Sequence, residues 1–247
     1  MTPPHPSFAL EVQPSKNSTM SFSSSPNPDN PQDDMQDERH TLHYVLVLDR
    51  SGSMRERMDE VRSAVNAQID ALAADSKRDG NECLLSIVRF DTEVEVVMLE
   101  EPIGDVKHLS ERDVKPRGMT ALIDATVLTI NQAARLVGPC IDGIRDSLAI
   151  VVYTDGGENA SRFHTSRDLE LALEHHQHLK GWDISFIGAS PDAFSLMRRA
   201  KFDRRKMASI DPKDSGRIMR DMTGMLRTKM STRKEMKIQD LEQRQKR

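Results

Sequence analysis

The sequence predicts an α/β domain in which a mainly parallel central sheet carries one antiparallel strand and has helices on both faces. Short β-rich runs alternate with longer helical runs, two of the short runs are apolar throughout, and two others are joined by a tight turn. The 247 residues are enough for one large domain of this class or for two small ones. No repeat at solenoid spacing occurs along the chain.

Six strands are expected, each from its own apolar run. Residues 44–48 and 148–153 are unbroken apolar segments, which is typical of parallel strands buried on both faces. Only Asp-Thr-Glu separates residues 84–90 from residues 94–99, so these two runs predict a hairpin and one antiparallel strand. Residues 184–188 predict a fifth strand, and residues 207–210 a weak edge strand.

Helices are expected between these strands, at residues 60–74, 121–137 and 169–179. In the first of them, Val61, Val65 and Ile69 recur at the spacing that places side chains on one helical face. A last helix is expected to be capped by Asp211 or Ser215.

The two ends differ in composition from the region between them. Residues 1–41 hold seven of the 12 prolines, seven serines, and six acidic residues against Lys16 and Arg39, which predicts a disordered acidic arm. Residues 225–247 hold eight Lys or Arg against three acidic residues, which predicts a fraying basic helix. We therefore place the folded domain at residues 42–230 and a basic tail at residues 231–247.

Composition also limits the classes of partner. A net charge of -4 argues against general nucleic-acid affinity, and no apolar run is long enough to cross a bilayer. The N-terminus lacks the basic start of a secretion signal. Cys83 and Cys140 lie within or beside apolar stretches, so we expect reduced, buried thiols and a cytoplasmic location.

Side chains with oxygen donors follow the ends of the expected strands. Asp49, Ser51 and Ser53 come directly after residues 44–48, Thr120 precedes the helix at 121–137, and Asp155 follows residues 148–153. Open α/β sheets bind their ligands at the carboxyl ends of the strands. We therefore expect these five side chains to converge.

Two carboxylates and three hydroxyls suit a hard divalent cation, because no Cys or His is present to favour zinc or a softer metal. Mg²⁺ is the natural candidate, with the hydroxyls in direct contact and Asp49 and Asp155 acting through bound water. The two carboxylates balance the charge of the ion, so an open coordination position would attract a carboxylate from a partner. The spacing predicts a metal-bridged protein contact.

The segment Asp49-Arg50-Ser51-Gly52-Ser53, with Thr120 and the turn at Asp155 downstream, resembles the metal-ion-dependent adhesion site of von Willebrand factor type A (vWA) domains. The likeness runs from about residue 43 to about residue 210. The motif segments are most similar to those of stand-alone intracellular vWA domains from bacteria and their phages. It implies a Rossmann-like sheet and a bound Mg²⁺ or Mn²⁺ that mediates protein binding. In the family, the threonine approaches or leaves the metal as the binding state changes.

These observations favour a non-enzymatic, cation-dependent interaction module that serves as an adaptor or assembly factor. A second possibility is the metal-site subunit of a larger complex whose separate ATPase is a partner. A metal-dependent phosphatase is less favoured, because Ser51 stands where a second acid is expected two residues after Asp49. The chain has neither a P-loop nor a Gly-x-Ser-x-Gly motif.

Several other polar residues have a structural interpretation beside a functional one. Thr120 could cap the following helix, Asp124 could support its first turn, and Glu158 could either bind a partner or belong to a surface turn. His175 and His178 share a helical face, but a solvated face is a better interpretation than a zinc site. The same holds for the basic cluster, which could otherwise bind nucleic acid or an acidic protein and consists of Arg198, Arg199, Lys201, Arg204, Arg205 and Lys206.

Overall fold

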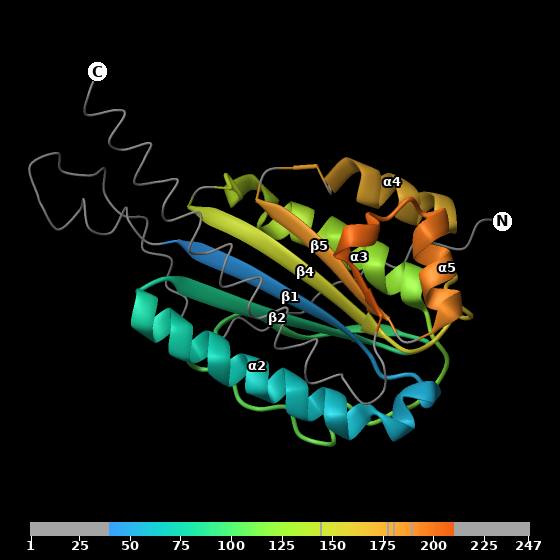
Figure 1. The fold of residues 1–247 in the computed structure, drawn as a ribbon, viewed down its shortest axis with the longest axis horizontal. Coiled ribbons are helices and arrows are strands. Elements are labelled where there is room, and N and C mark those ends of the chain that lie inside the picture. The colour runs from blue at the N-terminus through green and yellow to red at the C-terminus, as the bar shows by residue number, and fades with distance from the viewer. Residues whose placement is uncertain (1–39, 144, 177, 180, 189, 210–247) are drawn as a thin grey trace, which may run out of the picture. The chain divides into compact units, whose positions relative to one another are not determined.

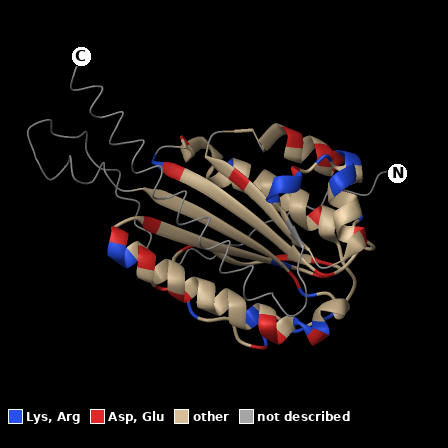
Figure 2. Ribbon diagram, viewed as in Figure 1, with Lys and Arg blue, Asp and Glu red and all other residues tan. Residues whose placement is uncertain are grey.

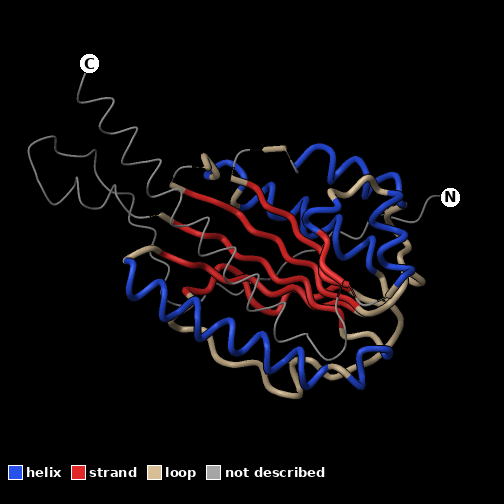
Figure 3. Tube along the Cα trace, in the orientation of Figure 1, coloured by secondary structure: helices blue, strands red, loops and turns tan. Residues whose placement is uncertain are grey.

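A computed structural model describes residues 40–143, 145–176, 178–179, 181–188 and 190–209. The described residues form one sheet with the strand order β3-β2-β1-β4-β5-β6 (Figures 1 and 3). Its strands are β1 (Thr41–Asp49), β2 (Glu82–Phe90), β3 (Val94–Pro102), β4 (Asp146–Thr154), β5 (Trp182–Gly188) and β6 (Met207–Ser209). All pairings are parallel except that of β2 with β3, which confirms the expected fold class.

Every expected strand is present, and several begin earlier than the apolar runs predict. β1 opens at Thr41, where the N-terminal arm was expected to end, because the backbone ladder continues beyond the apolar residues. The Thr41 N–H donates to the Arg145 carbonyl at 2.8 Å, and the Glu82 N–H donates to the His40 carbonyl at 2.9 Å. The start of β1 is thus set by backbone hydrogen bonds, which the pattern of polar and apolar residues does not show.

Four α-helices accompany the strands in the described part: α2 (Met58–Asp79), α3 (Leu122–Leu136), α4 (Ser166–His176) and α5 (Pro191–Arg199). Short 3-10 turns lie at η1 (Gly52–Glu56), η2 (Gly138–Cys140) and η3 (Arg204–Lys206). α4 ends before Leu179, which is exposed, so the expected helix at 169–179 is too long at its C-terminal end.

The helix α5 is absent from the sequence prediction because it has only nine residues. Its start carries a clear signal, since the Ser190 hydroxyl accepts a hydrogen bond from the Asp192 N–H at 3.1 Å and Pro191 follows the cap. The expected acidic arm, the helix capped by Asp211 or Ser215 and the basic tail lie outside the described residues.

Helices cover both faces of the sheet, α2 on one and α3, α4 and α5 on the other (Figure 1). Alternate residues of β1 supply the two cores: Leu46 packs on the α2 side, and Val47 packs on the α3 side. Charged residues lie mainly on the helices and near the strand ends, leaving the middle of the sheet apolar (Figure 2).

The chain order creates a switch point in the sheet. After β1, the chain passes through α2 to β2 on one side of β1, and after β3 it crosses through α3 to β4 on the other side. The carboxyl ends of β1 and β4 therefore meet where the connections diverge, which is where open α/β sheets bind ligands.

The edge strand β3 is irregular. Its register with β2 shifts between Leu85 and Ile87 and again between Ile87 and Val88. Glu100 has a φ of 50°, an uncommon value for a residue other than glycine. The Ser86 hydroxyl accepts the Glu100 N–H at 3.0 Å and donates to the Glu100 carboxylate at 3.2 Å, so side-chain contacts hold the irregular segment.

The cysteines correct one expectation. Both are free thiols, and Cys83 is buried as expected, but Cys140 is exposed because it closes the η2 turn at the surface. Within the described ranges, no helix is both long and apolar enough to cross a membrane.

Leu46→Ala tests the core on the α2 side of the sheet. Leu46 is 1% exposed, so the substitution should lower the free energy of unfolding by about 2–5 kcal/mol through lost burial and a residual cavity. Urea denaturation measures the change. Leu171→Ala is the control, since Leu171 is 47% exposed, and an equal loss in both variants would contradict the assigned core.

Candidate metal centre

Asp49 ends β1 and is fully buried. One of its carboxylate oxygens, Oδ1, accepts the Ser51 N–H at 2.6 Å, and the other, Oδ2, accepts the Thr154 hydroxyl. Thr154 ends β4, the strand paired with β1. The side chain of Asp49 is therefore fixed by the two strands that meet at the switch point.

The serine hydroxyls continue this hydrogen-bonded chain toward the surface. Ser51 is buried, and its Oγ lies 3.0 Å from the Oγ of Ser53. The exposed Ser53 hydroxyl donates to Asp155 Oδ1 at 2.7 Å. Four of the five expected residues thus form a continuous polar cluster that opens to solvent at Ser53.

Thr120 reaches the same cluster across the backbone of Gly156. A Cβ atom at Gly156 would lie 2.7 Å from Thr120 Oγ1 and 3.3 Å from Ser53 Oγ. Gly156 therefore packs against both hydroxyl groups, and a side chain there would collide with Thr120. All five side chains named from the sequence lie together at the carboxyl ends of β1 and β4.

The electrostatics of the cluster are dominated by Asp49. Burial raises the pKa of this carboxyl from 3.8 to about 6, against the opposing hydrogen bonds from Thr154 and Ser51, and the charge of Asp155 raises it further. A buried carboxylate with a second one nearby is costly to ionise in the metal-free protein. A cation beside it would remove that cost.

The donor set fits a hard divalent cation, since every candidate donor is oxygen. Among the described residues, no group of three or more His, Cys, Asp or Glu side chains is placed to hold a metal ion. A cation at this place would therefore depend on the hydroxyls of Ser51, Ser53 and Thr120 as well as on the two carboxylates.

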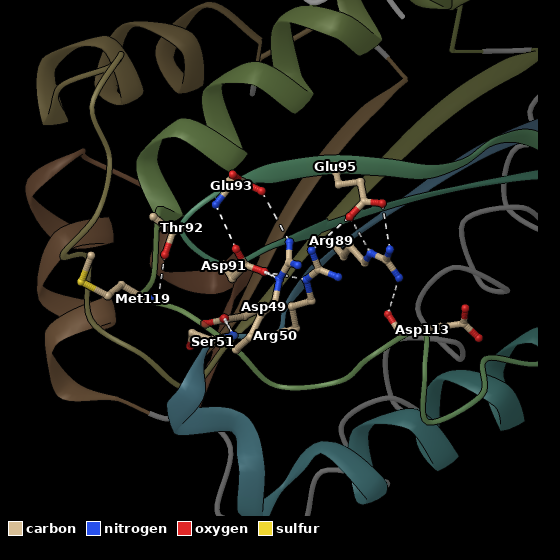
Figure 4. A network of polar contacts seen from close by, with 11 residues as sticks. Asp49, Arg50, Ser51, Arg89, Asp91, Thr92, Glu93, Glu95, Asp113 and Met119 are labelled. Carbon is tan, nitrogen blue, oxygen red and sulfur yellow. Dashed lines mark hydrogen bonds and ion pairs between the residues drawn. The ribbon is translucent and has the colours of Figure 1, made fainter. Parts of the chain in front are cut away.

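A third carboxylate, that of Asp91, joins the loops that carry these donors (Figure 4). It follows β2 and is 2% exposed. Its Oδ2 accepts hydrogen bonds from Arg50 Nε at 2.8 Å and from Arg117 Nε at 2.7 Å. Although burial opposes it, the bond from Arg117 helps to lower the pKa of Asp91, so this carboxylate is held ionised.

Backbone contacts reinforce the same junction. The Gly52 N–H donates to the Gly118 carbonyl at 3.1 Å, and the Arg117 N–H donates to the Arg50 carbonyl at 2.8 Å. Gly118 has a φ of 67°, and a Cβ there would lie 2.7 Å from Thr92 Oγ1. This junction is absent from the sequence prediction, although Asp91, an acidic residue directly after the apolar run at residues 84–90, was a signal for it.

The loop after β4 holds the other side of Thr120. The Thr120 N–H donates to Asn159 Oδ1 at 2.8 Å, and the Thr120 carbonyl accepts the Asn159 N–H at 3.0 Å. Glu158 accepts the Ile123 N–H at 2.8 Å and so binds the first turn of α3. The carboxylate of Glu158 therefore makes a structural contact, and its binding of a partner stays a prediction.

One expected helix contact at α3 proves wrong. The N-cap position belongs to Ala121, with no side-chain cap bond, because Glu158 reaches the helix from another loop. Thr120 is therefore not the cap residue. Asp124 lies in the first turn of α3, as expected, and its carboxylate accepts the backbone N–H groups of Arg162 and His164, at 2.7 and 2.8 Å.

The histidines at 175 and 178 and the basic cluster lie mainly at the surface. His175 and His178 are exposed, and the intervening His176 stacks on Trp182 with ring centroids 4.7 Å apart. In the basic cluster, half of the residues form ion pairs with acidic neighbours: Lys201 with Glu170, Arg205 with Asp203 and Lys206 with Asp183.

No protein-family model matches the sequence, and no curated protein matches it. Solved structures with similar folds do exist. A von Willebrand factor type A protein from Catenulispora acidiphila is 18% identical, with a TM-score of 0.51 over 75% of this chain and 42% of the other. The PilB minor pilin from Streptococcus sanguinis is 14% identical, with a TM-score of 0.54 over 76% and 61%.

A third similar structure is the vWF domain of the type V pili tip protein Mfa5 from Porphyromonas gingivalis. It is 11% identical, with a TM-score of 0.55 over 77% of this chain and 96% of that domain. At such identities the likeness concerns the fold alone, and the chain spans only 42% and 61% of the first two structures. The intracellular bacterial or phage type therefore stays a prediction, whereas the protein has a vWA-like α/β fold.

Proposed function

We propose that the protein is a cation-dependent interaction module that binds a carboxylate of a protein partner through Mg²⁺ or Mn²⁺. Asp49, Ser51, Ser53, Thr120 and Asp155 would hold the ion, directly or through water. When bound, the ion supplies an electrophilic centre with an open coordination position. The observation that carries the proposal is the convergence of these donors, from three separate loops, at the switch point of a vWA-like sheet.

The accessibility of the donors supports binding rather than catalysis. Asp49, the strand-end aspartate that the phosphatase alternative requires as its nucleophile, is fully buried, and both of its oxygens accept hydrogen bonds. Ser53 is exposed and linked to Asp155, so the open side of the cluster presents hydroxyls. A non-enzymatic adaptor in the cytoplasm is accordingly the role that we propose.

Metal binding predicts a change in stability that depends on Asp49. Saturating Mg²⁺ or Mn²⁺ should raise the melting temperature of the wild type, and a ligand at 100 times its Kd stabilises a fold by about 2.7 kcal/mol. Excess chelator should reverse the shift, and Asp49→Asn should show none. Differential scanning calorimetry measures both proteins, and an equal metal response in the variant would contradict the assigned ligand.

The same variant should behave differently without metal. An asparagine can still accept the Ser51 N–H and can donate to Thr154, while it removes a buried charge. In chelator at pH 7, Asp49→Asn is expected to be more stable than wild type by about 1–3 kcal/mol. Urea denaturation at several pH values measures the difference.

The pH dependence of that difference follows from the raised pKa of Asp49. Between pH 3.8 and about 6 the folded wild type binds more protons than the unfolded chain, so it loses stability as the pH rises through this range. The advantage of Asp49→Asn should therefore appear above pH 6 and vanish below pH 4. An advantage that persists at pH 3.5 would show that another effect of the substitution is responsible.

Partner binding tests the proposal at Thr120. Wild type should retain a partner from native lysate in Mg²⁺ and release it in chelator, whereas Thr120→Ala should retain little in either buffer. Mass spectrometry identifies the bound proteins. Thr126→Ala is the control, because Thr126 is buried like Thr120 but lies inside α3, where its hydroxyl donates to the Leu122 carbonyl at 2.8 Å. Equal retention by wild type and Thr120→Ala would place partner binding on another surface.

A further inference from the structure

Arg57 lies beside the candidate metal centre, between η1 and the start of α2. Its backbone is fixed on both sides, since its N–H donates to the Met54 carbonyl and its carbonyl accepts the Val61 N–H, each at 3.0 Å. The side chain is 29% exposed and places Nε 3.8 Å from Asp155 Oδ2. A positive charge therefore lies next to one of the two candidate carboxylate ligands.

The contact divides the two oxygens of Asp155 between different partners. Oδ1 accepts the Ser53 hydroxyl at 2.7 Å and belongs to the hydroxyl cluster, whereas Oδ2 faces Arg57. The side chain of Asp155 is only 7% exposed, so solvent screens this pair less than it would screen a surface ion pair. Arg57 can thus act on the charge of Asp155 without displacing the hydroxyls.

The guanidinium of Arg57 is also incompletely satisfied. Its Nη1 is buried and has no hydrogen-bond partner in the described part of the chain. A buried donor without a partner costs free energy, and the hydrogen bonds of this guanidinium do not offset that cost at Nη1. This guanidinium makes a charged contact with Asp155, at 3.8 Å from Nε to Oδ2.

We infer that Arg57 is the counter-ion of the candidate metal centre, which rests on the proposed function of that centre. In the metal-free protein its guanidinium faces Asp155 Oδ2, and when a divalent cation binds beside Asp155, the positive charge of Arg57 repels the ion. Arg57 therefore lowers the affinity of the site for metal, so that the site fills only at a higher concentration of the free ion.

A repulsive charge at Arg57 and a purely structural contact would change the affinity for Mg²⁺ in opposite directions. Removing the charge of Arg57 should tighten Mg²⁺ binding by about three- to tenfold at low salt, because a repulsion of this range is worth about 1 kcal/mol at a partly screened site. Loss of a structural contact would instead loosen the site and weaken binding. Isothermal titration of the chelator-treated full chain with MgCl₂ measures the dissociation constant.

The variants are chosen to separate charge from packing. Arg57→Gln removes the charge, Arg57→Met does so while keeping an apolar stem, and Arg57→Lys keeps the charge and should bind Mg²⁺ within about twofold of wild type. Arg55→Gln is the matched control, because Arg55 is an exposed arginine in η1, two residues before Arg57. Circular dichroism verifies that each variant is folded.

Tighter Mg²⁺ binding in Arg57→Gln or in Arg57→Met, with little change in Arg55→Gln, is the expected result. Equal or weaker binding in both Arg57 variants, relative to Arg55→Gln, would overturn the role of Arg57 while leaving the metal centre in place. The absence of saturable Mg²⁺ and Mn²⁺ binding by wild type would instead overturn the proposed function itself.

Discussion

The geometry of the candidate site depends on one buried carboxylate that is not among its expected ligands. Asp91 accepts hydrogen bonds from Arg50, which lies between two donor residues of the first loop, and from Arg117, which lies three residues before Thr120. The side chains of Asp91 and Arg50 are 3% and 5% exposed, and breaking such a buried pair typically costs about 3–5 kcal/mol. The position of the hydroxyl donors is thus set by ion pairs among residues that are not themselves candidate ligands.

A division of roles follows from this arrangement. The hydroxyl and carboxylate side chains of the cluster reach solvent at Ser53, whereas Asp91, Glu158 and Asn159 hold the loops around them. Glu158 accepts a hydrogen bond from the start of α3. Asn159 accepts the Thr120 N–H with its side chain and donates its own N–H to the Thr120 carbonyl. Because Asp91 follows β2 while Glu158 and Asn159 follow β4, the donors are held from two loops before any ligand arrives, which lowers the ordering cost of binding.

The strands and the five clustered side chains were predictable because both signals are local. An apolar run marks a buried strand, and a polar residue directly after it marks a strand end. The position of Asp91 after a strand run was such a signal, but its partners Arg50 and Arg117 were not predictable, since they come from loops that meet only in the folded chain. The same holds for the contacts of Glu158 and Arg57. The same reason explains the error at Thr120: Glu158, 35 residues from Ile123 in sequence, binds the helix start that Thr120 was expected to cap.

The irregular strand β3 has a consequence for how the molecule meets its surroundings. An edge strand with a regular backbone offers unpaired N–H and C=O groups to any extended chain, which is a route to aggregation. In β3, the register shifts, the positive φ of Glu100 and a proline at the strand's end interrupt that row of groups. This edge is therefore a poorer template for a strand from another molecule than a regular edge would be.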